Sequence, residues 1–142
     1  MGDIFYSDSS PGATKKSKIL IVDDNDFFRQ TLKTTLEASF PTMAIDEAGG
    51  GSKVLEKVDT FRPDLIFMDI HLSGESGLEL TKKIKATYPN INIVILTNHD
   101  IREYREAASQ CGADQFLVKD SFSRMELEEL VSLKAPQPYP VL

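Results

Sequence analysis

The sequence predicts an α/β domain in which a five-stranded parallel sheet carries helices on both faces. Short apolar runs recur along the chain, at residues 19–22, 65–68, 91–96 and 116–118, and a weaker alternating run covers residues 43–48. Unbroken apolar runs are typical of strands that are buried on both faces of a parallel sheet. Helical patterns separate the runs, and strand and helix alternate five times. Such alternation implies right-handed crossovers that cover both faces of one sheet.

Length and composition favour a single cytoplasmic domain. A chain of 142 residues is long enough to bury a real core. The net charge of −6 argues against direct binding of this segment to nucleic acid or to an anionic membrane. The longest apolar run is too short to span a bilayer. The only cysteine, Cys111, cannot form an internal disulfide, and we see no signal peptide, so a reducing cytosol is the expected compartment.

The first half of the chain begins with a segment that lacks periodicity. Residues 1–17 are predicted to be a flexible tail, residues 18–134 the folded domain, and residues 135–142 a proline-rich tail or the start of a linker. The first strand, 19–22, is followed by a helix that begins at Asn25 or Asp26 and reaches about Ser39. Its apolar stripe consists of Phe28, Leu32, Thr35, Leu36 and Phe40.

Residues 43–69 are predicted to contain an edge strand, a short helix and a buried strand. The edge strand covers residues 43–48, and Gly49-Gly50-Gly51 forms a plain loop after it. The following helix should turn Val54, Leu55 and Val58 inward and end before Pro63. The buried strand, 65–69, then ends on a carboxylate.

The second half repeats the pattern. A loop at 71–77 precedes a helix that buries Leu78 and Ile84 and stops near Pro89; the strand 91–96 and the loop 98–100 come next. A helix over about 101–110 should end at Gly112, a residue suited to a left-handed cap. After the strand 116–118, Ser123 and Glu126 form a capping box for the last helix. The inner face of that helix is predicted to be Leu127, Leu130, Val131 and Leu133.

Polar residues follow four of the five strands, where the carboxyl ends of parallel strands share one edge and open into a ligand crevice. These residues are Asp23 and Asp24, Asp69, Thr97, and Lys119. Because loops begin at strand ends, any one of them has an ordinary structural explanation. Together they fit a single reaction. Three clustered carboxylates need a cation, and oxygen ligands favour Mg²⁺. A carboxylate can also attack phosphorus, and an ammonium and a hydroxyl would then stabilise the phosphoryl oxygens.

These five positions, in this order, resemble the receiver domain of bacterial response regulators, over roughly residues 18–134. The resemblance implies a flavodoxin-like, doubly wound (βα)5 fold, and it implies that Asp69 takes a phosphoryl group from a sensor histidine kinase or a phosphotransfer protein. It implies that Asp24, Asp69 and the main-chain carbonyl of His71 ligate Mg²⁺, and that Asp23 holds the ion through water.

The resemblance also implies how the signal would be passed on. Thr97 would move toward the phosphoryl group, Phe116 would rotate inward behind it, and His71 and His99 would be exposed rim residues that tune dephosphorylation. We expect phosphorylation to promote a homodimer or partner contact through the fourth helix, fifth strand and fifth helix, with control of transcription as its output. Two positions depart from the family pattern: Asp120 replaces a frequent proline, and Phe116 has no hydroxyl.

Two other functions compete with a signalling receiver that is not a conventional enzyme. A phosphohydrolase of the haloacid dehalogenase type would also use Asp69 as nucleophile, but it usually has a second Asp where His71 stands. A pure interaction module with a dead site is disfavoured by the complete set of five residues. The stretch 112–120 looks most like regulators that carry a helix-turn-helix DNA-binding domain after the receiver.

Overall fold

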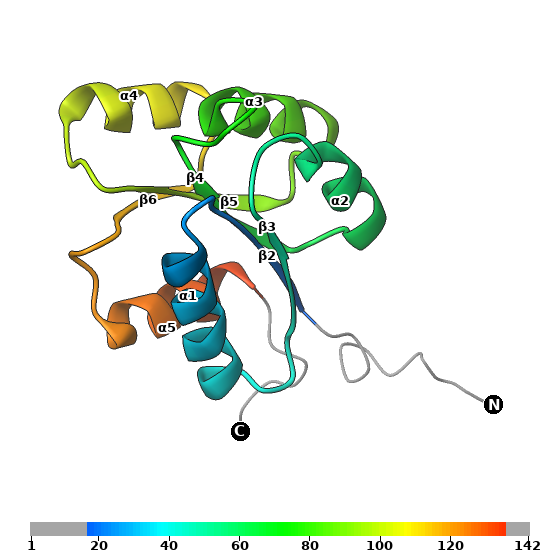
Figure 1. Cartoon of the computed structure of the whole chain (residues 1–142), viewed down its shortest axis with the longest axis vertical. Helices are drawn as coiled ribbons and strands as arrows, with labels where there is room; N and C mark the ends of the chain where they lie inside the picture. The colour runs from blue at the N-terminus through cyan, green and yellow to red at the C-terminus, as the bar shows by residue number, and fades with distance from the viewer. Residues whose placement is uncertain (1–16, 136–142) are drawn as a thin grey trace.

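The fold is a single parallel sheet with helices on both faces (Figure 1). The computed structural model describes residues 17–135; the predicted tails covered 1–17 and 135–142, and their residues 1–16 and 136–142 lie outside the described part of the chain. All five strands are parallel, as the sequence predicts, and they pair in the order β3-β2-β4-β5-β6. The elements are β2 (Lys18–Val22), α1 (Asp26–Ser39), β3 (Ala44–Ala48), α2 (Val54–Phe61), β4 (Leu65–Asp69), α3 (Gly77–Thr87), β5 (Asn92–Thr97), α4 (Arg102–Gln110), β6 (Gln115–Val118) and α5 (Arg124–Lys134).

Two apolar layers hold the helices against the sheet. Helices α1 and α5 cover one face, and α2, α3 and α4 cover the other (Figure 1). Successive side chains of a strand point to opposite faces, so the central strand β4 contributes side chains to both layers. Ile66 and Met68 pack under α2 and α3, whereas Leu65 and Phe67 pack under α1 and α5. All residues of β4 are buried, including its terminal Asp69. The site residue at the end of β4 is therefore carried by the most enclosed strand.

Local signals in the sequence set the helix ends as predicted. The Asn25 side chain accepts a hydrogen bond from the Phe28 N–H and caps α1, and Ser123 and Glu126 form the predicted capping box of α5. Gly112 has a φ of 92°, in the left-handed region that glycine adopts without steric cost. Strand β3 is an edge strand, as its weak alternation indicates.

Two predictions about helix faces are wrong. Leu55 in α2 and Leu133 in α5 were expected to face inward, but they are 41% and 82% exposed. Each helical residue is rotated by ~100° from the one before it. Leu55 therefore turns away from its buried neighbour Val54, and Leu133 lies well off the face that Leu127 and Val131 bury. None of the helices between residues 17 and 135 is long and apolar enough to cross a membrane.

Both ends of the described chain belong to the fold. Ser17, assigned to the N-terminal tail from the sequence, is buried, and its carbonyl accepts a hydrogen bond from the Ala44 N–H at 3.0 Å. Ala135, assigned to the C-terminal tail, is fully buried and packs in the layer of α1 and α5. Ser17 and Ala135 therefore pack against the elements between them.

We expect that Gly77→Ala destabilises the fold strongly. A Cβ atom at Gly77, the first residue of α3, would lie 1.9 Å from the Asp69 carbonyl oxygen, and a backbone atom cannot turn away. Overpacking of this kind costs about 1 to 3 kcal/mol or more in free energy of unfolding. Gly50→Ala is the matched control, since its Cβ would lie 3.1 Å from the Ser73 hydroxyl, which can rotate, and 3.6 Å from the Ser73 carbonyl oxygen, an ordinary van der Waals contact. Urea denaturation that gave the two variants equal stability would contradict this close contact.

Candidate acidic site at the carboxyl edge of the sheet

Three carboxylates meet where the two central strands end. Asp23 and Asp24 follow β2, and Asp69 is the last residue of β4, which pairs directly with β2. One oxygen from each of these carboxylates lies within 4.8 Å of the others. Asp23 and Asp69 are buried, whereas Asp24 is more exposed. The strand register therefore brings together the acids that the sequence singles out.

The Lys119 ammonium lies inside this cluster. Its Nζ is 2.6 Å from Asp23 Oδ2 and 3.4 Å from Asp69 Oδ2, and its side chain is only 6% exposed. The Phe28 ring covers the ammonium, with the ring centroid 4.8 Å from Nζ. Such a contact favours a cation over the aromatic face. Lys119, which follows β6, thus links the ends of β2 and β4, as its position after a strand suggests.

Main-chain donors hold the three acids in place. Asp23 Oδ1 accepts the Asn25 N–H at 2.8 Å, and Asp24 Oδ2 accepts the Ser73 N–H at 2.8 Å. Asp69 Oδ1 accepts the His71 N–H at 3.2 Å. The second oxygen of Asp24, Oδ1, is buried and has no hydrogen-bond partner among the described residues. An orphaned carboxylate oxygen beside two other acids is a free ligand atom for a cation.

The electrostatics of the cluster are unbalanced. Burial and the nearby Asp23 carboxylate raise the pKa of Asp69 to about 6, against the opposing influence of Lys119 and of the His71 N–H. One ammonium faces three carboxylates, so a further cation would relieve the repulsion. Oxygen donors alone suit a hard divalent ion such as Mg²⁺. The residues present therefore fit the magnesium site that the sequence predicts.

Thr97 lies at the same edge, at the end of β5, and it is fully buried. The preceding residue, Leu96, pairs with Asp69 across β4 and β5. The Thr97 hydroxyl accepts the His99 N–H at 3.1 Å. The hydroxyl therefore holds the start of the loop between β5 and α4, at the end of the strand that pairs with β4.

The rim residues gather around one aromatic ring. His71 and His99 are exposed, as predicted, and their rings lie 5.4 Å and 6.4 Å from the Tyr104 ring of α4. Phe116 of β6 is half-buried on the α4 side of the sheet. The Arg105 guanidinium covers the Phe116 ring at 4.5 Å and also pairs with Asp100 at 2.6 Å. The position of Phe116 in this structure is thus held by α4 and by the loop that precedes it.

Sequence reasoning missed three residues that shape the site. Phe28 was identified only as part of an apolar stripe, and Ser73 only as part of a loop. Arg29 donates to the main-chain carbonyl of Asp23 at 2.6 Å and was not identified at all. Phe28 and Ser73 act through contacts between elements that are distant in sequence, and Arg29 acts through the way α1 packs on the turn that precedes it. Contacts of these kinds leave no periodic pattern in the sequence.

We expect Asp69→Asn to stabilise the metal-free protein at neutral pH. The folded state raises the pKa of Asp69 from 3.8 to about 6, so the ionised carboxylate is destabilising, and this cost grows as the pH rises from about 4 to 6. The variant should therefore gain on the order of 1 to 2 kcal/mol in free energy of unfolding at pH 7, and much less at pH 4.

The measurement is urea denaturation with a chelator present, at pH 4, 5 and 7. Asp120→Asn is the matched control, since Asp120 is an exposed acid near the same edge. The ionised Asp69 carboxylate would not be destabilising if the gain in free energy of unfolding for Asp69→Asn did not depend on pH. The same conclusion would follow if Asp120→Asn showed an equal gain.

Comparisons with known proteins agree with this geometry. The sequence profile described as the response regulator receiver domain matches residues 19–132. The chain is 30% identical over 105 residues to the transcriptional regulatory protein DegU of Brevibacillus brevis, covering 74% of this chain and 44% of that protein. It is 33% identical over 102 residues to the chemotaxis protein CheY of Halobacterium salinarum, covering 72% of this chain and 83% of that protein.

A solved structure is equally similar. A two-component response regulator from Clostridium difficile superimposes with a TM-score of 0.76 at 30% identity, covering 83% of this chain and 94% of that one. The chain spans about half the length of the curated transcriptional regulators that it matches, from 44% to 53%.

Proposed function

The chain belongs to the response regulator receiver domain family, and from this premise we propose that Asp69 accepts a phosphoryl group. The phosphoryl donor would be a histidine kinase or a histidine phosphotransfer protein. The observation that carries the proposal is the joint contact of Lys119 with two carboxylates, at 2.6 Å to Asp23 and 3.4 Å to Asp69. This contact puts a fixed positive charge beside the acid that would react.

In the proposed reaction a carboxylate oxygen of Asp69 forms a bond to phosphorus as the bond from phosphorus to the donor imidazole breaks. With a pKa of about 6, Asp69 is mainly ionised at pH 7 and can act as the nucleophile. The Lys119 ammonium and the Thr97 hydroxyl would then stabilise the phosphoryl oxygens. The leaving imidazole keeps the electron pair and takes a proton.

Mg²⁺ would be held by Asp24, by Asp69 and by the main-chain carbonyl of His71, with Asp23 acting through water. When bound, this ion neutralises charge on the phosphoryl oxygens. The orphaned Oδ1 of Asp24 and the excess of negative charge support this assignment. His71 and His99, exposed at the rim, are proposed to tune how fast water removes the phosphoryl group.

The family supports phosphoryl acceptance over the competing hydrolysis. A phosphohydrolase of the haloacid dehalogenase type usually has a second Asp at the position of His71, and the match to receiver domains over residues 19–132 disfavours this alternative. The chain is therefore a signalling protein. We propose that its self-catalysed phosphorylation and dephosphorylation are slow switch reactions rather than substrate turnover.

We expect one acid-labile phosphoryl group per chain after incubation with Mg²⁺ and acetyl phosphate. Asp69→Asn should abolish labelling because the nucleophile is lost. Asp24→Ala should reduce labelling strongly and weaken Mg²⁺ binding, since it removes a ligand. Intact mass spectrometry gives the label, and calorimetric titration gives the Mg²⁺ affinity.

Asp120→Ala is the matched control, because Asp120 is an exposed acid near the same edge of the sheet. Undiminished labelling of Asp69→Asn would overturn the proposed acceptor. Equal Mg²⁺ affinity in Asp24→Ala and Asp120→Ala would overturn the proposed ligand.

The output surface is proposed to be formed by α4, β6 and α5. Helices α4 and α5 lie on opposite faces of the sheet, on either side of the edge strand β6 (Figure 1). Exposed charges of both signs on this surface suit a self-complementary two-fold contact; they are Arg102, Arg105, Asp120, Arg124 and Glu129. Lys119 also follows β6, but its side chain is buried in the acidic site and does not belong to this surface.

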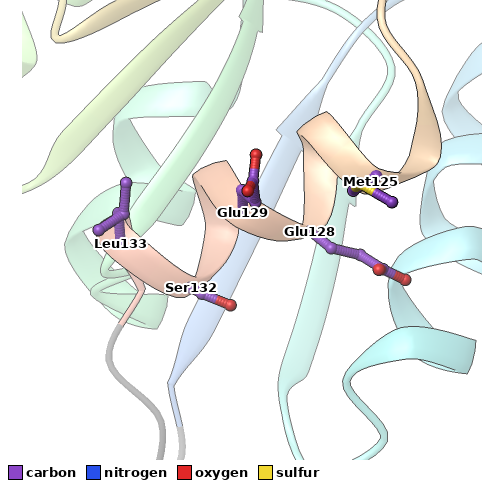
Figure 2. A pocket seen from close by; sticks show the side chains of 5 residues that line it. All are labelled: Met125, Glu128, Glu129, Ser132 and Leu133. Carbon is purple, nitrogen blue, oxygen red and sulfur yellow. The ribbon is translucent and has the colours of Figure 1, made fainter.

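The exposed side of α5 adds apolar area to this surface. Met125 and Leu133 are 70% and 82% exposed. They lie at either end of a shallow hollow of about 520 Å³ that Glu128, Glu129 and Ser132 also line (Figure 2). Exposed apolar side chains between charged ones are common in protein interfaces. The proposed partner is a second copy of this chain. We also propose that this contact serves to control transcription when the domain is part of a longer protein.

We expect beryllofluoride, a phosphoryl mimic, to change amide exchange across residues 98–134 and to promote dimerisation. Charge added beside Thr97 and Lys119 must displace the loops after β5 and β6, because packed interiors do not absorb displacement smoothly. The expected shift in the dimerisation equilibrium is about 1 to 3 kcal/mol. Exchange mass spectrometry and sedimentation measure the two effects.

The control is Asp69→Asn, which should not respond to beryllofluoride. Unchanged exchange across residues 98–134 in the parent protein, with beryllofluoride bound at Asp69, would contradict the switch. A simple phosphate sink would then be the better interpretation.

A further inference from the structure

Arg29, on the first turns of α1, is a cation tied to the backbone of the acidic turn rather than to its carboxylates. We propose that Arg29 is a positioning residue that holds the turn Asp23–Asp24 in the geometry that binds Mg²⁺. The inference rests on the proposed use of Mg²⁺ at this site. Its side chain is only 13% exposed, although arginine is usually a surface residue.

Each branch of the Arg29 guanidinium has its own acceptor. Nη1 donates to the main-chain carbonyl of Asp23 at 2.6 Å, Nε donates to Glu47 at 2.9 Å, and Nη2 donates to Asp26 at 2.8 Å. Three acceptors on three sides fix a planar group in one orientation. The carbonyl of Asp23 is therefore held by a group that cannot rotate freely.

Glu47 anchors Arg29 to the sheet. It lies in β3, the strand that pairs with β2, and its register partner is Ile21, two residues before Asp23. Glu47 also accepts from Gln30 and Lys33 at 2.9 Å each. Burial tends to raise the pKa of Glu47, but the hydrogen bonds from Lys33 and Arg29 bring it below its usual value, so the acceptor stays ionised.

Hydrogen bonds hold Asp23 in this turn at its N–H, its carbonyl and its carboxylate. The Asp23 N–H donates to the Ala48 carbonyl of β3 at 3.1 Å, the Asp23 carbonyl accepts from Arg29, and the Asp23 carboxylate accepts from the Asn25 N–H. The bond from Arg29 fixes the peptide plane that joins Asp23 to Asp24. The direction of the Asp24 side chain depends on that plane, and so does its contact with the Ser73 N–H.

The glycine loop after β3 leaves room for this arrangement. A Cβ atom at Gly49 would lie 3.3 Å from Nη1 of Arg29, which is tighter than ordinary van der Waals contact. Farther along the same loop, the Gly51 N–H donates to the Ser73 carbonyl at 2.9 Å. One loop therefore packs against both residues that hold the acidic turn, Arg29 and Ser73.

A purely electrostatic role and a positioning role predict opposite effects of Arg29 removal on the affinity for Mg²⁺. If Arg29 acted only through its charge, its loss would remove repulsion and Mg²⁺ would bind more tightly. If Arg29 positions the turn, its loss frees the peptide between Asp23 and Asp24, and Mg²⁺ binds less tightly. The sign of the change in affinity therefore separates the two roles.

The experiment is calorimetric titration of Mg²⁺ into the metal-free protein. Arg29→Met should weaken Mg²⁺ binding at least fivefold. Lys33→Met is the matched control, since it removes the other cation paired with Glu47 from the same helix but touches no atom of Asp23. Lys33→Met should leave the affinity unchanged or slightly raised. Arg29→Lys keeps the charge but cannot donate in three directions, so it should be intermediate.

Circular dichroism and urea denaturation establish that each variant is folded, and Arg29→Lys decides the matter if Arg29→Met does not fold. Equal or tighter Mg²⁺ binding in a folded Arg29→Met would overturn the positioning role while leaving the proposed function intact. Equal weakening in Lys33→Met would overturn it too, because the loss would then follow from Glu47 alone. A parent protein that does not bind Mg²⁺ would overturn both proposals together.

Discussion

Like-charge repulsion between buried carboxylates is the constraint on which the rest of this structure depends. Asp23 and Asp69 end strands that are enclosed on both faces, so neither can turn out to bulk water. Desolvated acids at this separation cannot all stay ionised without a cation. Burial first, and then the charge of Asp23, raise the pKa of Asp69 above its usual value. The site is thus destabilising by itself, and the surrounding fold must supply the groups that hold it together.

Those groups come from nearly every element that reaches the carboxyl edge of the sheet. Lys119 crosses from the end of β6, Ser73 and His71 donate their N–H groups from the loop after β4, and Arg29 comes from α1. Each is held by a further contact of its own, such as the Phe28 ring over the ammonium. The acidic cluster therefore lies at the centre of a network of donors rather than at the mouth of an empty cleft.

The difference between strand ends, which a local pattern marks, and contacts between separate elements explains which features could be predicted from the sequence. Buried strands leave unbroken apolar runs, and the residue after each run must lie at the carboxyl edge of the sheet. The positions of Asp23, Asp69, Thr97 and Lys119 at this edge could therefore be predicted from the sequence. Caps such as Ser123 are equally local. The buried face of a short helix is harder to predict, because a shift of one position along the helix decides whether a side chain such as Leu55 is buried or exposed. The roles of Arg29 and Ser73 could not be predicted, since they depend on how α1 and the loop after β4 meet the turn at Asp23 and Asp24.

The same reasoning bears on how a signal would leave the site. Phe116 has no hydroxyl, so its position can be coupled to Thr97 only through packing and through the chain between them. That chain is short and continuous in the structure: the Thr97 hydroxyl holds the His99 N–H, Asp100 follows, and Asp100 pairs with Arg105. Arg105 in turn covers the Phe116 ring. Any inward rotation of that ring must break its contact with Arg105, and any movement of Thr97 must pull on the loop that orients Arg105. The two ends of the proposed switch are therefore joined by one ion pair on the surface of α4, which is weak enough in water to yield to a charge added at Asp69.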